Sequence, residues 1–431
     1  MPPWRLMIGL IVLSFLYACA EDQDTDHYKP SEISSRISDS IMVHVRAGQV
    51  SSQDDFNETR DRFARMLVDS MQSAGLDSTE KYERATVLYW SGEREEAEKI
   101  FKELTLIEDD LARKSLVQLI TIKIEGGKWD DAEEMMREYR ESYPPAPEAP
   151  VSLRLCVDDL SGRYNNKDRP EDAIRVILDE INNQPFNYPY SSFSLVGELA
   201  PLMIETGKVP QLKELVTNIR ENLDQSLKIR LARSASPDSV SEDFDELKKS
   251  FEGYIKAMDM LLASLDLIGR SAPRINALHV FNADSTFTMK RCTGRVTIMD
   301  FWTTWCTACV IGYVELGELY SQYSRDDLAA VGITSYQGVI YDLASGEREG
   351  SRDDPVSRDK ERKYIERYIG DHKITWPCII SDRSALDPEY HINGLPTYVI
   401  LDRKGIVRYM HMGVGKQRQM KRVIDRLLAG K

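Results

Sequence analysis

The chain has 431 residues, enough for two or three domains, and its apolar fraction of 42% is sufficient to form sizeable cores. Its formal net charge of −14 argues against a protein that binds nucleic acid or an anionic lipid surface, because both need a basic face. Six cysteines in a chain of this length do not make a disulfide scaffold of the kind that small secreted domains use.

The first residues have the pattern of an export signal. Arg5 precedes an apolar run over residues 6–17, which has the size of a signal-peptide core and is shorter than the roughly 20 residues of a membrane-spanning helix. The run ends in Leu16-Tyr-Ala-Cys19, which resembles a bacterial lipobox. The resemblance implies a signal peptide over residues 1–18 and a lipid anchor at Cys19. An ordinary signal peptide with a coincidental cysteine is the alternative.

An exported and acylated protein would be held in the bacterial cell envelope, facing the periplasm or the exterior. The residues that follow the anchor, 19–55, are polar and rich in Ser and Asp, with one apolar patch at Ile41–Val45. We interpret them as a tether with one short helix.

Residues 56–235 are predicted to be helical, with four related segments. Each consists of a helix, a short turn and a second helix, and the second helices align at Ala97, Ala132, Ala173 and Leu212, in steps of 35, 41 and 39 residues. The pattern resembles tetratricopeptide repeats, whose period is about 34 residues, although the third and fourth segments depart from it. The resemblance implies a curved array that binds a protein partner. An irregular bundle that acts only as a spacer is the alternative.

Residues 236–267 are predicted to form one long amphipathic helix after a hinge of small residues. Apolar residues recur every three or four positions from Phe244 to Leu265. We expect this helix to cap the repeat array. Packing on the next domain and dimerisation are the alternatives.

The stretch that follows carries the clearest chemistry. A β-branched and apolar run from Arg295 to Asp300 predicts a strand, and two cysteines, Cys306 and Cys309, then precede a helical pattern. A Cys-x-x-Cys pair at the start of a helix suits dithiol chemistry, because the unpaired N–H groups and dipole of the first turn stabilise a thiolate. The two-residue spacer lets the second sulfur resolve a mixed disulfide formed by the first.

A zinc site and a structural disulfide are the alternative interpretations of this pair. A zinc site needs two more ligands, and the sequence has neither a second Cys-x-x-Cys nor a close histidine pair. A structural disulfide would close a very short and easily reduced loop.

The flanking residues resemble the thioredoxin superfamily. The segment Asp300-Phe-Trp-Thr-Thr-Trp-Cys-Thr-Ala-Cys309 is similar to its active-site signature, and Leu395-Pro396-Thr397 stands where the superfamily has a cis-proline before a strand. The resemblance implies a buried carboxylate at Asp300, below the dithiol. Ile268-Gly-Arg-Ser-Ala-Pro273 further resembles the entry of the TlpA/ResA-like branch, whose members are exported and membrane-tethered.

This resemblance covers residues 268–431 and implies an α/β thioredoxin-like fold after the all-α repeat domain. We expect a hairpin over residues 278–290, a parallel strand at Leu328–Ser335, a mobile surface loop over 347–362 and an antiparallel hairpin whose strands are 397–401 and 406–411. A helix from Gln417 to Leu428 is expected to close the domain.

The resemblance also implies a role for each site residue. Cys306 would be the exposed nucleophile and Cys309 the resolving thiol, with Asp300 as general base on Cys309. The cis-Pro396 residue would keep the backbone of Leu395 open to pair with an extended substrate segment. Trp305 and Thr397 would also contact the substrate. Trp302 and Trp305 would shield the site.

The expected activity is thiol–disulfide exchange on protein substrates, without a dissociable cofactor or metal. The residues between the cysteines, Thr307 and Ala308, bring no charge that would stabilise a strongly oxidising pair, so we expect a disulfide reductase supplied with electrons by a membrane donor. A thiol peroxidase remains an alternative, since Thr303 lies three residues before Cys306, although Met299 stands where peroxidases have proline. A scaffold whose helical region does the work is another. The remaining cysteines, Cys156, Cys292 and Cys378, are predicted to be structural.

Overall fold

The computed structural model describes residues 28–46, 53–71, 73–107, 110–143, 151–183, 189–234, 242–342, 345–351 and 353–430. The chain divides into two compact units, Met1–Asp159 and Leu160–Lys431. The expected signal peptide and Cys19 lie outside the described residues. Within the described ranges, no helix is both long and apolar enough to cross a membrane.

The first unit is helical and begins with a helix in the segment where the sequence analysis expected a tether with one short helix. Helix α2 (Pro30–Arg46) buries Ile33, Ile37 and Ile41, which recur once per turn, in a core shared with Phe63 of α3 (Gln53–Leu67). The helix expected in this segment is therefore present, but it is 17 residues long and packs in a core rather than forming part of a tether. The unit continues with η1 (Val68–Ser70), α4 (Ser78–Ser91), α5 (Arg94–Leu104), α6 (Asp110–Glu125), α7 (Trp129–Ser142) and the start of α8 (Val151–Asn166).

Each of the four predicted repeat segments is a helix, a turn and a second helix, formed by α4–α5, α6–α7, α8–α9 (Pro170–Asn183) and α10–α11 (Pro189–Glu205, Val209–Ser234). The residues that end the first helix of each pair have positive φ, which favours a helix stop: Gly92, Gly127, Asp168 and Gly207. The aligned residues in the second helices are fully buried: Ala97, Ala132, Ala173 and Leu212. The alignment therefore identified the buried face of each second helix. A relation to tetratricopeptide repeats stays a prediction.

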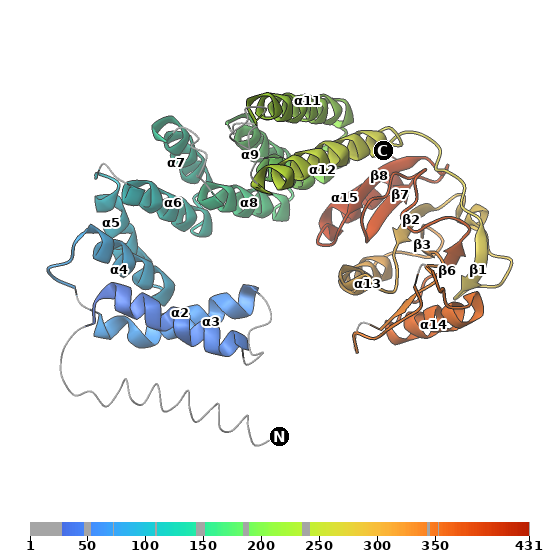
Figure 1. The fold of residues 1–431 in the computed structure, drawn as a ribbon, viewed down its shortest axis with the longest axis horizontal. Helices are drawn as coiled ribbons and strands as arrows, with labels where there is room; N and C mark the ends of the chain where they lie inside the picture. The colour runs from blue at the N-terminus through green and yellow to red at the C-terminus, as the bar shows by residue number, and fades with distance from the viewer. Residues whose placement is uncertain are drawn as a thin grey trace, which may run out of the picture. The chain divides into compact units, whose positions relative to one another are not determined.

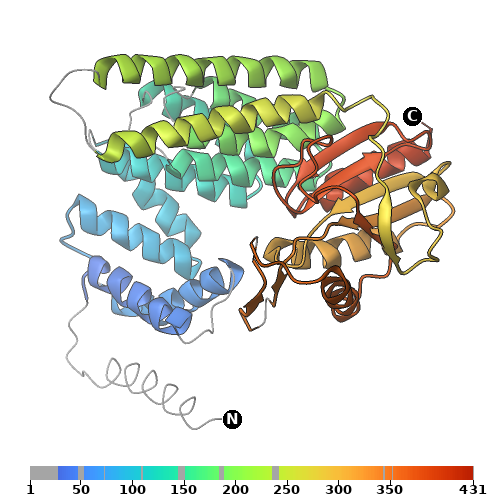
Figure 2. The same ribbon diagram turned by 45° about the vertical axis from the view of Figure 1, so that its right-hand side comes forward.

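In the second unit the long helices lie side by side. Helix α12 (Glu242–Leu265) packs along α11 and also contacts α10, as the yellow-green and yellow helices of Figure 2 show. The predicted amphipathic helix is thus present, with Phe251, Met258 and Leu265 buried.

The rest of this unit is an α/β domain around a six-stranded sheet (Figure 1). The strand order is β1-β6-β3-β2-β7-β8, with β2, β3 and β6 parallel and the others antiparallel to their neighbours. The strands are β1 (Ala277–Phe281), β2 (Val296–Phe301), β3 (Leu328–Thr334), β6 (Cys378–Ser381), β7 (Thr397–Leu401) and β8 (Val407–Met412).

Three helices serve this sheet: α13 (Thr307–Ser321), α14 (Arg358–Asp371) and α15 (Gln417–Leu428). The crossovers β2–α13–β3 and β3–α14–β6 move along the sheet in one direction, and such crossovers are right-handed, so both helices cover the same face. Helix α15 contacts α13 and lies on that face too.

Two local predictions in this domain are wrong. Residues 278–290 do not form a hairpin, because β1 pairs with β6 and residues Met289–Cys292 form the short helix η2. The Asp284 carboxylate organises the turn between them, since it accepts from the Thr286 N–H at 3.0 Å and forms an ion pair with Arg291.

The charged tract at 347–362 is largely structured. It contains β5 (Arg348–Glu349), which pairs with β4 (Ile340–Tyr341), and the first turn of α14. The buried carboxylate of Glu361 accepts the N–H groups of Gln337 and Gly338, at 2.6 and 3.1 Å. These bonds fix α14 to the chain that leaves β3.

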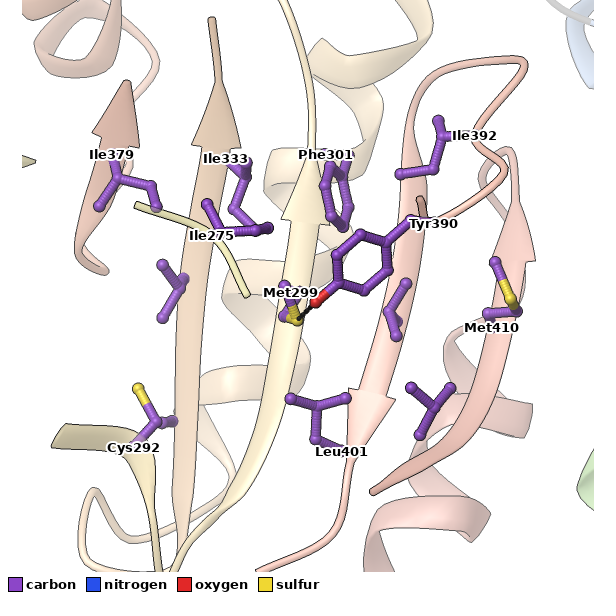
Figure 3. Packing of buried hydrophobic residues seen from close by; sticks show 14 of the residues in the cluster. Ile275, Cys292, Met299, Phe301, Ile333, Ile379, Tyr390, Ile392, Leu401 and Met410 are labelled. Atoms are coloured by element: carbon purple, nitrogen blue, oxygen red, sulfur yellow. Dashed lines mark hydrogen bonds between the residues drawn. The ribbon is translucent and has the colours of Figure 1, made fainter. Parts of the chain in front are cut away.

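The opposite face of the sheet carries an apolar core, to which Ile275, Tyr390 and Ile392 contribute from outside the helices and strands (Figure 3). Met299 and Phe301 of β2 point into this core, where the Tyr390 ring lies 5.1 Å from that of Phe301. The Tyr390 hydroxyl donates to the Pro273 carbonyl at 2.7 Å and lies 3.7 Å from the Met299 sulfur. Tyr390 thereby anchors the segment that leads to Pro396.

Candidate functional site

The two cysteines lie where the buried strand β2 gives way to α13. Cys306 is the N-cap residue of the helix, and its sulfur accepts the Cys309 N–H at 3.1 Å. The two residues form a disulfide, with their Cα atoms 5.3 Å apart. The positive end of the helix dipole acts on the Cys306 sulfur, which would favour its thiolate in the reduced protein.

The exposure of Cys306 is lower than expected. Cys306 is 5% exposed and Cys309 0%, so both are buried and Cys306 is only slightly more accessible. Its sulfur is directed back onto the first turn of α13 and bonded to Cys309, which accounts for its low accessibility in this disulfide form.

Asp300 lies in β2 on the face that α13 covers. Its side chain is fully buried, and neither carboxylate oxygen has a hydrogen-bond partner among the described residues. Burial raises the pKa of Asp300 to about 8. A carboxyl group with a pKa in this range can both accept and return a proton near neutral pH.

Aromatic side chains make these surroundings apolar. Trp302 is fully buried, stacks on Tyr368 at 5.6 Å and meets Tyr313 edge-on at 5.7 Å. Burial also raises the pKa of Tyr368, to about 12. Trp302 thus shields the site from below, whereas Trp305 is 42% exposed and lies on the surface beside Cys306.

The loop with Pro396 meets α13 from the other side, and the Leu395–Pro396 peptide bond is cis. Only glycine fits at position 312 of α13, because a Cβ there would lie 2.2 Å from the Tyr398 hydroxyl and 3.6 Å from Pro396. The absence of a side chain at Gly312 therefore lets the Pro396 loop pack directly against α13, the helix that carries the dithiol.

The loop is held by its own hydrogen bonds. The Thr397 hydroxyl donates to the Gly394 carbonyl at 2.7 Å, and the Gly413 N–H donates to the Pro396 carbonyl at 2.8 Å. Thr397 is buried and its hydroxyl supports the loop, and its contact with a substrate stays a prediction. Leu395 is half-buried, and in the described part of the chain no hydrogen bond engages its backbone N–H or carbonyl.

The sheet also aligns residues that sequence reasoning did not connect with the site. Asp300 pairs with Tyr398 of β7 and Tyr398 with His411 of β8, while on the other side Asp300 pairs with Gly332 of β3 and Gly332 with Cys378 of β6. Directly paired residues point to the same face, so Cys378, Asp300, Tyr398 and His411 form one buried row. The predicted hairpin 397–401/406–411 was the signal that could have placed Tyr398 opposite His411.

Burial shifts each member of the row toward its neutral form. It raises the pKa of Cys378 and of Tyr398, with a smaller contribution from Asp300 in both cases, and lowers the pKa of His411 to about 3. Gly332 leaves room within the row for the Trp302 indole nitrogen, which would lie 2.8 Å from a Cβ at that position.

The other cysteines are buried, with Cys292 in η2 and Cys156 in α8, where the Thr121 hydroxyl and the Cys156 sulfur lie 3.6 Å apart. Among the residues described, no group of three or more His, Cys, Asp or Glu side chains is arranged to hold a metal ion.

Comparison with known proteins agrees with this geometry. Residues 268–428 match the Redoxin family. The C-terminal region is a thioredoxin-like domain. The predicted fold class, this domain preceded by a mostly helical region, is confirmed.

Three relatives are similar over this region. Thioredoxin-like protein YneN of Bacillus subtilis (strain 168) is 24% identical over 132 residues, which are 31% of this chain and 65% of that protein. Sporulation thiol-disulfide oxidoreductase A of the same organism is 24% identical over 30% of this chain and 66% of its own length. Thiol-disulfide oxidoreductase ResA of Geobacillus kaustophilus (strain HTA426) is 25% identical, over 31% and 63%. The chain thus spans just under two thirds of the length of these relatives.

Solved structures are similar over the same part of the chain. StoA from Bacillus subtilis is 21% identical and matches over 36% of this chain and 98% of its own, with a TM-score of 0.27. Thioredoxin-like superfamily protein SPOA0173 is 18% identical over 37% and 96%, with a TM-score of 0.30.

Proposed function

We propose that this protein is a thiol–disulfide oxidoreductase of the cell envelope that reduces disulfides in protein substrates. The observation that carries the proposal is the position of the Cys306–Cys309 pair at the N-terminus of α13, with Asp300 buried below it and the cis-Pro396 loop beside it. Two similar proteins are named thiol-disulfide oxidoreductases, which supports the same chemistry.

The reaction begins with both cysteines reduced. The Cys306 thiolate attacks one sulfur of the substrate disulfide, which forms a mixed disulfide and releases the other substrate sulfur as a thiolate that takes a proton from water. Cys309 gives its proton to the Asp300 carboxylate and attacks the Cys306 sulfur. The second substrate thiolate leaves, and the Cys306–Cys309 disulfide remains. Two electrons have then passed from the protein to the substrate.

The residues around the thiolate support the reducing direction in this proposal. Strong oxidants of this class stabilise the nucleophilic thiolate heavily, and Thr307 and Ala308 carry no charge that would do so. Continued turnover then requires a dithiol donor that reduces the Cys306–Cys309 disulfide. For an exported protein we propose a membrane protein in this role.

The segments before the α/β domain would attach the protein to a membrane and bind a protein partner. The lipobox-like segment that ends at Cys19 supports attachment to a membrane, and the paired helices α4–α11 provide surface for a protein partner. The membrane attachment and the partner surface are both inferred from the sequence pattern. The helical pairs of the structure support the partner surface.

The proposal is tested by the reduction of insulin disulfides with dithiothreitol as the final reductant. We expect the wild-type protein to accelerate the reaction and Cys306→Ser to abolish the acceleration. Brief iodoacetamide treatment of the reduced protein should label Cys306 before Cys309, because α13 stabilises its thiolate and it is the more accessible of the two. Equal activity of the wild type and Cys306→Ser would contradict the proposal.

A further inference from the structure

A small apolar pocket lies between the helices and the edge of the sheet in the second unit. It has a volume of about 140 Å³ and lies against α10, α12 and β8. Phe193 and Pro201 line it from α10, Met260 and Leu261 from α12, and Met410 from β8. These helices precede residues 268–428, so the pocket adds a feature from outside the Redoxin match.

The pocket adjoins the cis-Pro396 loop. Asn393 and Thr397, the residues on either side of Gly394–Pro396, both line it, and so does Met412 at the end of β8. The Met412 side chain is 51% exposed and lies on Gly394, where an added Cβ would be only 2.2 Å from the sulfur. The pocket is therefore lined in part by residues of the cis-Pro396 loop. In the described part of the chain, no hydrogen bond engages the backbone N–H or carbonyl of Leu395 in this loop.

Helix α10 is fixed beside β8 by ion pairs. Arg422 of α15 binds Glu205 at the end of α10, including a bond of 2.9 Å, and it also contacts Asp168 at 3.0 Å. Lys416 pairs with Glu198, the neighbour of pocket residue Gly197. These contacts hold the helical wall of the pocket in a fixed position on the α/β domain.

We propose that this pocket receives a large apolar side chain of the substrate polypeptide, such as Leu, Met or Phe, while the substrate backbone pairs with Leu395. The inference rests on the proposed function and adds a specificity site to it. Side chains of an extended segment alternate between two faces. Thr397 and Met412 point away from the face of Asp300 and Tyr398, so a substrate side chain directed away from the dithiol faces the pocket.

The lining determines the kind of side chain that fits. The described lining is mostly apolar, and it includes no Asp or Glu, so a Lys or Arg side chain would lose its hydration without finding a carboxylate partner. Its polar members are Ser264, His391, Asn393, Thr397 and His411. The volume is close to that of an apolar protein cavity of about 150 Å³ that holds benzene. Three methionines, Met260, Met410 and Met412, can adapt to side chains of different shape.

Gly197 allows the pocket to be filled by substitution. A Cβ added there meets no atom within 4 Å, so Gly197→Leu would begin its side chain in open space at the pocket. Gly253 of α12 is a matched control, because it is also a helical glycine with no atom within 4 Å of an added Cβ, and it does not line the pocket.

The test uses disulfide-bonded peptides in a Ser/Gly background, with a single Leu moved through the positions on each side of the cysteine. Each rate is divided by the same variant's rate with hydroxyethyl disulfide, which corrects for differences in folding and in the dithiol. We expect the wild type and Gly253→Leu to favour one Leu position by about tenfold or more in kcat/KM, and Gly197→Leu to lose this preference. Gly197→Ala should retain most of it.

A wild type without any Leu preference, or a preference that Gly197→Leu retains, would overturn the pocket assignment while leaving the proposed function intact. A wild type that fails to reduce hydroxyethyl disulfide would instead contradict the proposed function itself.

Discussion

Asp300 and Tyr398 lie directly opposite each other on the antiparallel strands β2 and β7, and both side chains are buried on the face that α13 covers. Neither the carboxylate oxygens of Asp300 nor the Tyr398 hydroxyl has a hydrogen-bond partner among the described residues. The dithiol helix therefore packs over two polar groups whose protonation is controlled mainly by their exclusion from water.

Asp300→Asn should change how stability depends on pH. An aspartate with a pKa of about 8 in the folded protein and about 4 when unfolded holds its proton only in the folded state between these values, so the wild type loses stability as the pH rises toward 8. Asparagine does not titrate. The stability of the variant relative to the wild type should rise by about 3 kcal/mol from pH 5 to pH 8, as measured by urea unfolding of the oxidised proteins.

Asp326→Asn is the control for this measurement, because Asp326 is an exposed aspartate of the same domain. It should give the pH dependence of the wild type.

Asp300→Asn should also slow insulin reduction at neutral pH by about 100-fold, the lower range for loss of a general base. An unchanged rate would remove Asp300 from the mechanism.

Tyr398→Phe should move the pH profile of the reaction upward. Loss of the hydroxyl makes the surroundings of Asp300 still less polar, which raises the pKa of its carboxyl group and shifts the rise in rate to higher pH. The measurement is the rate of insulin reduction between pH 6 and about pH 9, a range that brackets the Asp300 pKa of about 8.

Tyr409→Phe is a matched control for this variant. Its hydroxyl is also buried without a partner among the described residues, but the charged groups that act on it are Glu205 and Arg422 rather than Asp300. Identical profiles for the two variants would show that Tyr398 has no specific effect on the carboxyl group.

The sequence predicted the parts of this structure that depend on local pattern. The strand, the Cys306–Cys309 turn and the helix are adjacent in the chain, and the buried face of each second repeat helix follows from a recurring position. Tyr398 and His411 were missed, although the hairpin that contains them was predicted, because the register was not followed across the sheet to Asp300.

Contacts between distant segments could not be predicted in this way. Glu205 and Arg422 are 217 residues apart, and neither belongs to a recognisable motif. The hairpin expected at 278–290 failed for a related reason, since β1 finds its partner in β6, about a hundred residues later. The pocket beside the cis-Pro396 loop likewise combines residues that are far apart in the chain, from α10, α12 and β8.

Arg422→Met should destabilise the protein by about 3 kcal/mol or more, because it leaves the carboxylate of Glu205 buried without its partner. The Glu205 side chain is 3% exposed and that of Arg422 20%. Lys421→Met, on the same helix, removes an exposed pair with Asp425 and should cost less than about 1 kcal/mol. Urea unfolding of both variants at pH 7 measures the difference, and equal losses would contradict the structural role of Arg422.

The central claim is that Cys306 attacks substrate disulfides and Cys309 releases them, and the Cys309→Ser variant tests it most directly. Without Cys309, the mixed disulfide between Cys306 and a substrate has no internal thiol to resolve it. After expression in cells, non-reducing gels should show adducts of this variant that disappear with dithiothreitol, and mass spectrometry should locate the bond at Cys306. The double variant Cys306→Ser, Cys309→Ser retains Cys156, Cys292 and Cys378 and should give no such adducts. The same bands in both variants would contradict the account.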